Sequence, residues 1–256
     1  NDNASYVDLL CYGELGFIDI SVSVGTPFID GNGNEFYDFE WIGPGGPYDT
    51  QNIDNLSGGE YTLTIIDDLG CVEIFTQVIN EPDELVLSGS SSDITCYGDN
   101  DGAITLDVEG GTPPYEYVWT GPGGPYDTQD LTDLGPGTYT VVVTDAVYDL
   151  VDDTDCAEET LSFEIIEPEG LDITIDNVTD NSCFSFDFSD GSIDFTVTGG
   201  SGIYTYILTN TAPPNDNFII NFFPTSFSGV YAGEWILEVE DFGGCSYTYP
   251  DPIIVS

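Results

Sequence analysis

Short runs of alternating apolar and polar residues recur along the chain. In residues 18–24, 104–108 and 193–197 every second residue is aliphatic or aromatic, and the residues between are Asp, Ser or Thr. Because side chains two residues apart in a strand share a face, each run predicts a strand with one buried face and one face in water. Gly and Pro separate these runs and no segment keeps a helical period, so the pattern predicts an all-β fold.

An internal repeat groups the strands into units. The nonapeptide Gly-Pro-Gly-Gly-Pro-Tyr-Asp-Thr-Gln occurs at residues 43–51 and again, unchanged, at residues 121–129, each time two residues after a Trp. A Glu-Pro pair occurs at residues 81–82 and again 86 residues further along the chain, at residues 167–168. This period exceeds the roughly 20–50 residues of a solenoid repeat and fits a small domain. We therefore predict domains at residues 1–82, with a truncated first strand, at residues 83–168 and, in divergent form, at residues 169–256.

Each unit has the strand pattern of an immunoglobulin-like sandwich. About seven short strands fit each unit, and a Leu stands five residues before each of Tyr61 and Tyr139, as in the tyrosine corner of such domains. We predict three tandem immunoglobulin-like β-sandwich domains. Pro250 and Pro252 interrupt the last strand, which should therefore lie at a sheet edge. The Trp residues are expected in the cores rather than as ligand platforms: Trp41, Trp119 and Trp235.

The charge of the chain narrows its chemistry. It contains 48 Asp and Glu and no Lys, Arg or His, for a net charge of −48. Nucleophile–His pairs, Schiff-base lysines and arginine clamps are thus excluded, and we expect no enzyme. Nucleic acid and anionic membrane surfaces are excluded as partners, because both require basic groups on the protein. Carboxylate-pair glycoside hydrolysis and metal binding through oxygen remain chemically feasible.

Three motifs of the second unit give the chain a family resemblance. They are Cys-Tyr-Gly-x-x-Asp-Gly-x-Ile at residues 96–104, Gly-Gly-Thr-Pro-Pro-Tyr-x-Tyr-x-Trp at residues 110–119, and Leu-x-x-Gly-x-Tyr-x-Val-x-Val-x-Asp at residues 134–145. Together they resemble the SprB repeat of giant surface adhesins in gliding Bacteroidota. The resemblance is close in the second unit, moderate in the first and weak in the third. It implies an extracellular, type 9-secreted filament or adhesin at the cell surface. The sequence has no Met, no signal peptide and no run long enough to span a membrane, which predicts a mature piece of something longer.

Two functions fit this resemblance, and a third competes with them. As a stalk, the repeats are protease-resistant spacers for surface attachment or cell contact, bundled with copies of themselves as a homo-oligomer. As an adhesive module, one repeat binds an extracellular or cell-surface polysaccharide. The third reading is a carboxylate-based enzyme that processes glycans, although no acid pair stands out among the 48.

The cysteines form three pairs of similar spacing. The separations are 60, 60 and 62 residues, which predicts the disulfides Cys11–Cys71, Cys96–Cys156 and Cys183–Cys245 and an oxidising exterior. Each bond would close a loop within one domain and contribute about 4 kcal/mol in the chain-entropy model. The alternative, a metal site, lacks a His ligand and a Cys-x-x-Cys motif.

Calcium is the cofactor that the acidic clusters suggest. Residues 30–35, inserted in the first unit, resemble part of an EF-type loop, but Glu35 replaces its Gly. The alternative is that Asp-Gly and Asn-Gly segments are turns. The candidate ligands are Asp30, Asn32, Asn34, Asp99, Asp101, Asp149, Asp152, Asp153 and Asp155.

The two nonapeptides supply one further candidate site. Tyr48 and Tyr126 could stack on sugar rings while nearby acids accept hydroxyl hydrogens. The alternative, which we favour, is a structural turn copied by domain duplication.

Overall fold

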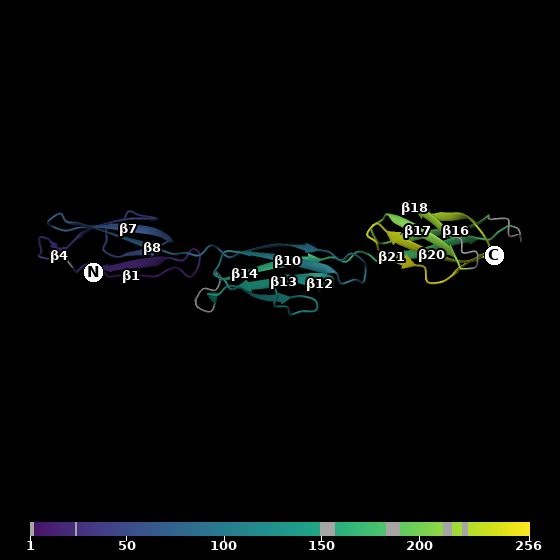
Figure 1. Ribbon diagram of the computed structural model, residues 1–256, viewed down its shortest axis with the longest axis horizontal. Coiled ribbons are helices and arrows are strands. Elements are labelled where there is room, and N and C mark those ends of the chain that lie inside the picture. Colours follow the sequence, from purple (N-terminus) through teal and green to yellow (C-terminus); the bar gives the residue numbers. More distant parts are fainter. Residues whose placement is uncertain (1–2, 24, 149–156, 183–189, 212–216, 222–224) are drawn as a thin grey trace. The chain divides into compact units, whose positions relative to one another are not determined.

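The computed structural model describes residues 3–23, 25–148, 157–182, 190–211, 217–221 and 225–256, with residue 3 and residues 217–221 described by backbone alone (Figure 1). Its regular elements are β-strands, and every pairing with a determined direction is antiparallel. The described residues contain no α-helix, so none of them forms a helix that could cross a membrane. The predicted all-β, immunoglobulin-like fold is confirmed.

Contacts group the chain into two compact units, residues 1–88, 106–119 and 141–161 in unit 1 and residues 89–105, 120–140 and 162–256 in unit 2.

The first predicted repeat lies within unit 1 and has two main sheets. One has the order β1-β2-β6 and the other β5-β7-β8. A small hairpin, β3-β4, holds the inserted residues 30–34 in its turn. The strands are β1 (Asn3–Tyr6), β2 (Gly16–Ser21), β3 (Phe28–Ile29), β4 (Glu35–Phe36), β5 (Asp38–Ile42), β6 (Ile53–Leu56), β7 (Gly59–Ile66) and β8 (Val72–Ile79). One core joins both main sheets and includes Ile18, Trp41, Tyr61 and Leu63.

The middle predicted repeat contributes strands to both units. Its two sheets have the orders β12-β10-β9 and β11-β13-β14. The strands pair as in the first repeat, with β9, β10 and β12 in the places of β1, β2 and β6, and β11, β13 and β14 in the places of β5, β7 and β8. The strands are β9 (Val86–Ser92), β10 (Gly102–Glu109), β11 (Glu116–Thr120), β12 (Leu131–Leu134), β13 (Gly137–Thr144) and β14 (Glu158–Ile165). The alternation of buried and exposed residues in β13 is identical to that in β7, and that in β12 is identical to that in β6.

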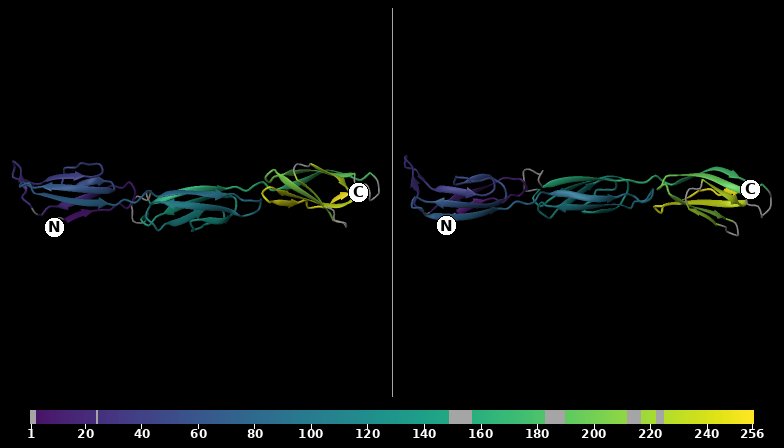
Figure 2. Two further views of the ribbon diagram at one scale, coloured as in Figure 1. Left: turned by 45° about the horizontal axis from the view of Figure 1, so that its top comes forward. Right: turned by 90° about the horizontal axis from the view of Figure 1, so that it is seen from above.

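The third predicted repeat lies within unit 2. One sheet has the order β15-β16-β19; the other has the order β18-β17-β20-β21, with β22 also paired to β20. Pro250 and Pro252 thus split the last strand into two short pieces at the sheet edge, as predicted. The strands are β15 (Asp172–Thr179), β16 (Gly191–Thr198), β17 (Tyr204–Asn210), β18 (Asn217–Asn221), β19 (Ser226–Val230), β20 (Gly233–Asp241), β21 (Ser246–Thr248) and β22 (Ile253–Val255). Figure 2 shows the strands running along each repeat.

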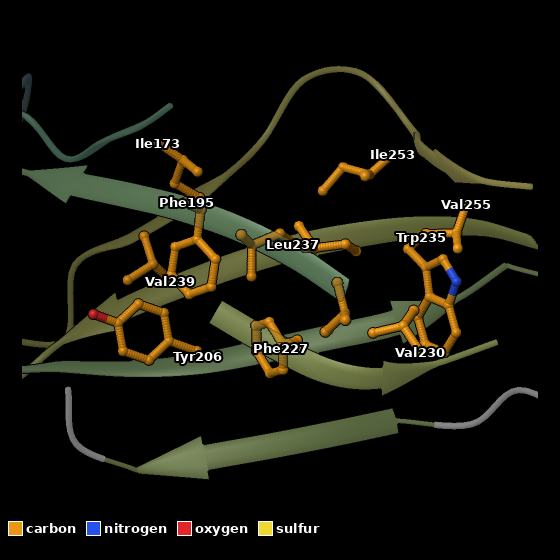
Figure 3. Close-up of a cluster of buried hydrophobic side chains, with 12 residues drawn as sticks. Ile173, Phe195, Tyr206, Phe227, Val230, Trp235, Leu237, Val239, Ile253 and Val255 are labelled. Carbon is orange, nitrogen blue, oxygen red and sulfur yellow. The ribbon is translucent and has the colours of Figure 1, made fainter. Parts of the chain in front are cut away.

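The core of the third repeat is aromatic. Phe195 of β16 stacks on Phe227 of β19, with ring centroids 5.5 Å apart, and its ring also contacts Tyr206 of β17 at 5.2 Å. Trp235 of β20 lies at the other end of this cluster (Figure 3). The predicted alternation is confirmed, because Phe195 and its neighbour two residues before, Ile193, are buried.

The three Trp residues are core residues, as predicted. Trp41, Trp119 and Trp235 are each fully buried. The predicted tyrosine corner is also present, since the Tyr61 hydroxyl donates to the carbonyl of Ser57 at 2.8 Å and that of Tyr139 to Gly135 at 3.0 Å. In the third repeat the indole N–H of Trp235 makes the same bond, to the carbonyl four residues before it, at 3.0 Å.

Candidate functional site: the cysteine turns

One end of each repeat is built on a buried aspartate. Asp67 and Asp145 directly follow β7 and β13, Asp241 is the last residue of β20, and all three are 6–7% exposed. A buried carboxylate needs compensating donors, and in a chain without basic side chains these are backbone N–H groups. Each of the three carboxylates accepts N–H bonds both from its own turn and from a second segment, so it ties the turn to the rest of the repeat.

In two of these turns a cysteine stands four residues after the aspartate. Asp241 Oδ1 accepts the N–H of Cys245 at 2.9 Å, and Oδ2 accepts that of Ser201 at 2.8 Å. The turn of the first repeat has the matching bonds. Asp67 Oδ1 accepts the N–H of Cys71 at 2.8 Å, and Oδ2 accepts that of Thr26 at 3.1 Å. The N–H of Cys71 is the main reason why the pKa of Asp67 is lowered below its usual value of 3.8.

A glutamate builds the opposite end of the repeat. Glu81 of the first Glu-Pro pair accepts the N–H of Gly13 at 2.7 Å and that of Gly58 at 2.9 Å. Glu167 of the second pair accepts the N–H of Gly98 at 2.8 Å. Gly13 and Gly98 each lie two residues after an opening cysteine. The recurring glutamate therefore fixes the Cys-Tyr-Gly loop beside the end of the repeat's last long strand.

The two cysteines of one repeat consequently lie at opposite ends of it. The Cys11 loop is held beside the start of β7, whereas Cys71 follows the end of that strand. Eight strand residues span about 25 Å, and a disulfide requires Cα atoms within about 7 Å. The predicted bond Cys11–Cys71 is therefore wrong, and Cys71 is a free, exposed cysteine.

The observed disulfide joins two successive repeats. Cys96, which opens the middle repeat, is bonded to Cys245 of the third, with S–S 2.05 Å and Cα–Cα 5.5 Å. Because Cys96 and Cys245 are bonded to each other, the predicted bonds Cys96–Cys156 and Cys183–Cys245 are wrong as well. Cys156 and Cys183 lie outside the described residues.

The opening cysteine of the first repeat also packs against the middle repeat. Cys11 is disulfide-bonded and 1% exposed. Its side chain forms a buried cluster with Val147 and Ala157, which lie between β13 and β14. The opening cysteine of the first repeat thus packs on the turn that follows the buried aspartate of the middle repeat, where Cys245 stands in the third. In the sequence, the separation of 149 residues between Cys96 and Cys245 carried the signal of a bond between repeats.

The residues suggested as calcium ligands are engaged in turns. Asp30 Oδ1 accepts the N–H groups of Asn32 and Asn34, both at 2.8 Å, and Oδ2 accepts the side-chain amide of Asn34 at 2.9 Å. The N–H of Asn34 chiefly lowers the pKa of Asp30. Asp101 accepts the N–H of Thr95 at 2.9 Å, while Asp99 donates its own N–H to Cys96.

No metal cluster appears in the described part of the chain, where three or more Asp, Glu or Cys side chains do not come together. The remaining candidates lie outside the described residues: Asp149, Asp152, Asp153 and Asp155. Calcium binding stays a prediction.

The repeated nonapeptides form turns that fold over their own tyrosines. Tyr48 donates its hydroxyl to the carbonyl of Pro44 at 2.8 Å, and Tyr126 donates to Pro122 at 2.7 Å. A Cβ added at Gly45 would lie 2.8 Å from the Tyr48 hydroxyl, so glycine is needed for this close approach. These contacts favour the structural turn over a sugar platform.

A shallow hollow of about 470 Å³ lies on the strands of the middle repeat in unit 1. Its lining combines apolar side chains with acids and one aromatic ring, a combination able to receive a sugar. The lining includes Pro114, Glu116, Val118, Thr144, Tyr148 and Glu158.

Comparison with known families identifies part of the chain. Residues 88–124 and 175–213 match the SprB repeat, which confirms the resemblance in the middle and third repeats. The middle match contains Cys96 and its loop. No curated protein sequence matches the chain.

The similar solved structures are distant. They include eight N-terminal immunoglobulin domains of Down Syndrome Cell Adhesion Molecule (10% identity, 86% of this chain, 32% of that chain, TM-score 0.44) and the insect immune protein hemolin (13%, 99%, 73%, 0.23). The S-layer protein rSbsC is also similar (12%, 98%, 40%, 0.20). The chain spans about a third of the first of these, and at such scores the similarity carries no functional information.

Proposed function

We propose that this chain is a non-catalytic segment of an extracellular repeat protein, a filament or adhesin at the cell surface, in which consecutive repeats are bonded covalently. The disulfide Cys96–Cys245 carries the proposal, because it joins two repeats that both match SprB. A bond of this kind persists in an oxidising exterior. With no Lys or Arg, the chain also offers trypsin-like proteases no site of cleavage.

Immunogold electron microscopy of native cells tests this role. Antibodies raised against the folded chain should label surface filaments of unpermeabilised cells, and trypsin treatment of these cells should leave the label in place. Label that appears only after permeabilisation would contradict the proposal.

A glycan-binding module is the second candidate, and the hollow of the middle repeat favours it. Tyr148 is the aromatic residue of its lining, and Glu116 and Glu158 supply acceptors for sugar hydroxyls. A glycan array should then give a signal that Tyr148→Ala abolishes and Tyr126→Phe, outside the hollow, preserves. The glycan-processing enzyme remains the third candidate, and it requires hydrolysis that a single Asp or Glu substitution in this hollow abolishes.

Bundling with copies of itself and calcium binding belong to the same proposal. Surfaces that carry only negative charge repel one another, and about 1 M salt reduces the screening length to about 3 Å. We expect association to require salt or calcium, and calcium to raise the melting temperature. Light scattering and thermal unfolding with and without a chelator measure both; association unchanged in low salt with chelator contradicts this part.

A further inference from the structure

The turn of Cys71 has the same construction as the turn that forms the disulfide at Cys245. Cys71 accepts the N–H of Asp67 at 3.1 Å through its carbonyl, and Cys245 accepts that of Asp241 at 2.9 Å. In both turns the glycine before the cysteine donates to the aspartate carbonyl, at 2.9 Å for Gly70 and 3.0 Å for Gly244. The Cys71 turn therefore has the backbone hydrogen bonds of the turn whose cysteine is disulfide-bonded, although Cys71 itself is a free cysteine.

The two cysteines differ in whether the opening cysteine of a preceding repeat is bonded to them. Cys245 is bonded to Cys96 of the preceding repeat, and Cys11 of the first repeat is buried against Ala157 of the middle repeat. Cys71 is the second cysteine of the first repeat, and it is free. An equivalent partner would be the opening cysteine of a repeat that precedes the first.

We propose that Cys71 is a covalent acceptor site for the opening cysteine of a preceding SprB-like repeat. The successive disulfides of such an array would be staggered, each joining the opening cysteine of one repeat to the second cysteine of the next. This inference rests on the repeat organisation in the proposed function and not on adhesion. The preceding repeat belongs either to the same polypeptide or to another copy of this chain.

The bond forms by thiol–disulfide exchange with a small oxidised disulfide. The thiolate of one cysteine attacks that disulfide and releases one thiol; the second cysteine then attacks the mixed disulfide and releases the other thiol. Two protein thiols are thus oxidised, one disulfide is reduced, and the two protons are retained on the released thiols. The oxidising exterior inferred for this protein supplies such a disulfide.

An extended chain tests the site directly. One additional copy of residues 83–168 is placed before residue 1, with Cys156→Ser in that copy, and the protein is refolded in a glutathione redox buffer. Peptides are mapped after cleavage at aromatic residues, because the chain has no site for trypsin. Cys71 should be joined to the added copy's opening cysteine, and its alkylation should fall to background. Substituting that opening cysteine by Ser should restore alkylation of Cys71.

The unextended chain, oxidised in parallel, distinguishes the source of the partner. Oligomers on non-reducing gels that Cys71→Ser abolishes show that another copy supplies the cysteine; a monomer beside a bonded extended chain shows that a preceding repeat of the same polypeptide supplies it. Cys96–Cys245, measured in each sample, reports correct folding. If that bond forms while Cys71 stays alkylatable in both chains, the proposal is overturned. The surface-labelling experiment would be unaffected, so the two proposals fail separately.

Discussion

The turns after β7 and β20 have the same hydrogen bonds and different covalent states. In each, a buried aspartate accepts the cysteine N–H through Oδ1 and a distant backbone N–H through Oδ2. Cys245 is bonded to Cys96, and Cys71 is free. The turn is therefore determined by residues within its own repeat, whereas the disulfide is determined by the neighbour. Local construction and covalent pairing are separate properties of this chain.

Serine substitutions at the two cysteines should separate these properties most clearly. Cys245→Ser removes a loop closure of 149 residues and should lower the free energy of unfolding by about 5 kcal/mol, the upper value of the chain-entropy model. Cys71→Ser, in an equivalent turn, should change it by less than about 0.5 kcal/mol. Denaturant unfolding under oxidising conditions measures both. Cys96→Ser is the matched control and should reproduce Cys245→Ser; equal effects at Cys71 and Cys245 would contradict the difference between the turns.

The aspartates should respond alike, because their bonds are alike. Asp241→Asn keeps one acceptor oxygen and replaces the other by an N–H₂ group, which leaves a buried backbone N–H unpaired and should cost about 1–3 kcal/mol. Asp67→Asn should destabilise the first repeat in the same direction. Hydrogen exchange of the N–H groups of Ser201 and Thr26 locates each effect. A loss at Asp241 alone would mean that the disulfide, rather than the carboxylate, determines the turn.

The glycines beside the aspartates sharpen the comparison further. Gly200 and Gly25 both have positive φ, so alanine is strained at either position, by about 1 kcal/mol. An added Cβ at Gly200 would also lie 2.6 Å from Cδ2 of Leu171 and 2.8 Å from Oδ2 of Asp241. At Gly25 the nearest atoms would be Cε1 of Tyr37 at 3.3 Å and Oδ2 of Asp67 at 3.5 Å. Gly200→Ala should therefore cost about 1 kcal/mol more than Gly25→Ala. Thermal unfolding of the two variants measures this difference, and equal costs would show that backbone strain alone decides.

The strands and cores could be predicted from the sequence, because their signals are local. Alternation placed Ile18 and Phe195 in cores, and the spacing around Tyr61 predicted its hydrogen bond to the preceding backbone. The disulfide pairing could not be predicted from spacing alone. Separations of 60–62 residues within repeats and 145–149 between them recur equally well. The length of β7 decides between pairing within a repeat and pairing between repeats, because this strand holds the Cys11 and Cys71 segments at opposite ends of one repeat.

The roles of the acids also exceeded what the sequence could indicate. The recurring Glu-Pro pair marks Glu81 in the sequence, but neither this recurrence nor the position of Asp67 indicates which backbone groups these carboxylates bind. The distinguishing property is the convergence of backbone N–H groups from segments far apart in the chain, and this convergence exists only after folding.

Acid titration should give the smallest and most selective difference. The N–H of Cys71 lowers the folded-state pKa of Asp67 below 3.8, so the stability that this carboxylate contributes is complete above about pH 4 and is lost as the pH falls through the lowered pKa. The pKa of Asp101 is lowered mainly by its hydrogen bond with Thr95, and it acts in the same direction. Protonation of the other acids relieves repulsion in a chain of charge −48, which opposes this loss.

About 1 M salt screens the repulsion and leaves the short hydrogen bonds in place. In such salt, the stability difference between the wild type and Asp67→Asn should therefore be constant from pH 7 to 5 and should narrow below pH 4. A difference that stays constant to pH 2 would mean that the Asp67 carboxylate contributes through its shape rather than its charge.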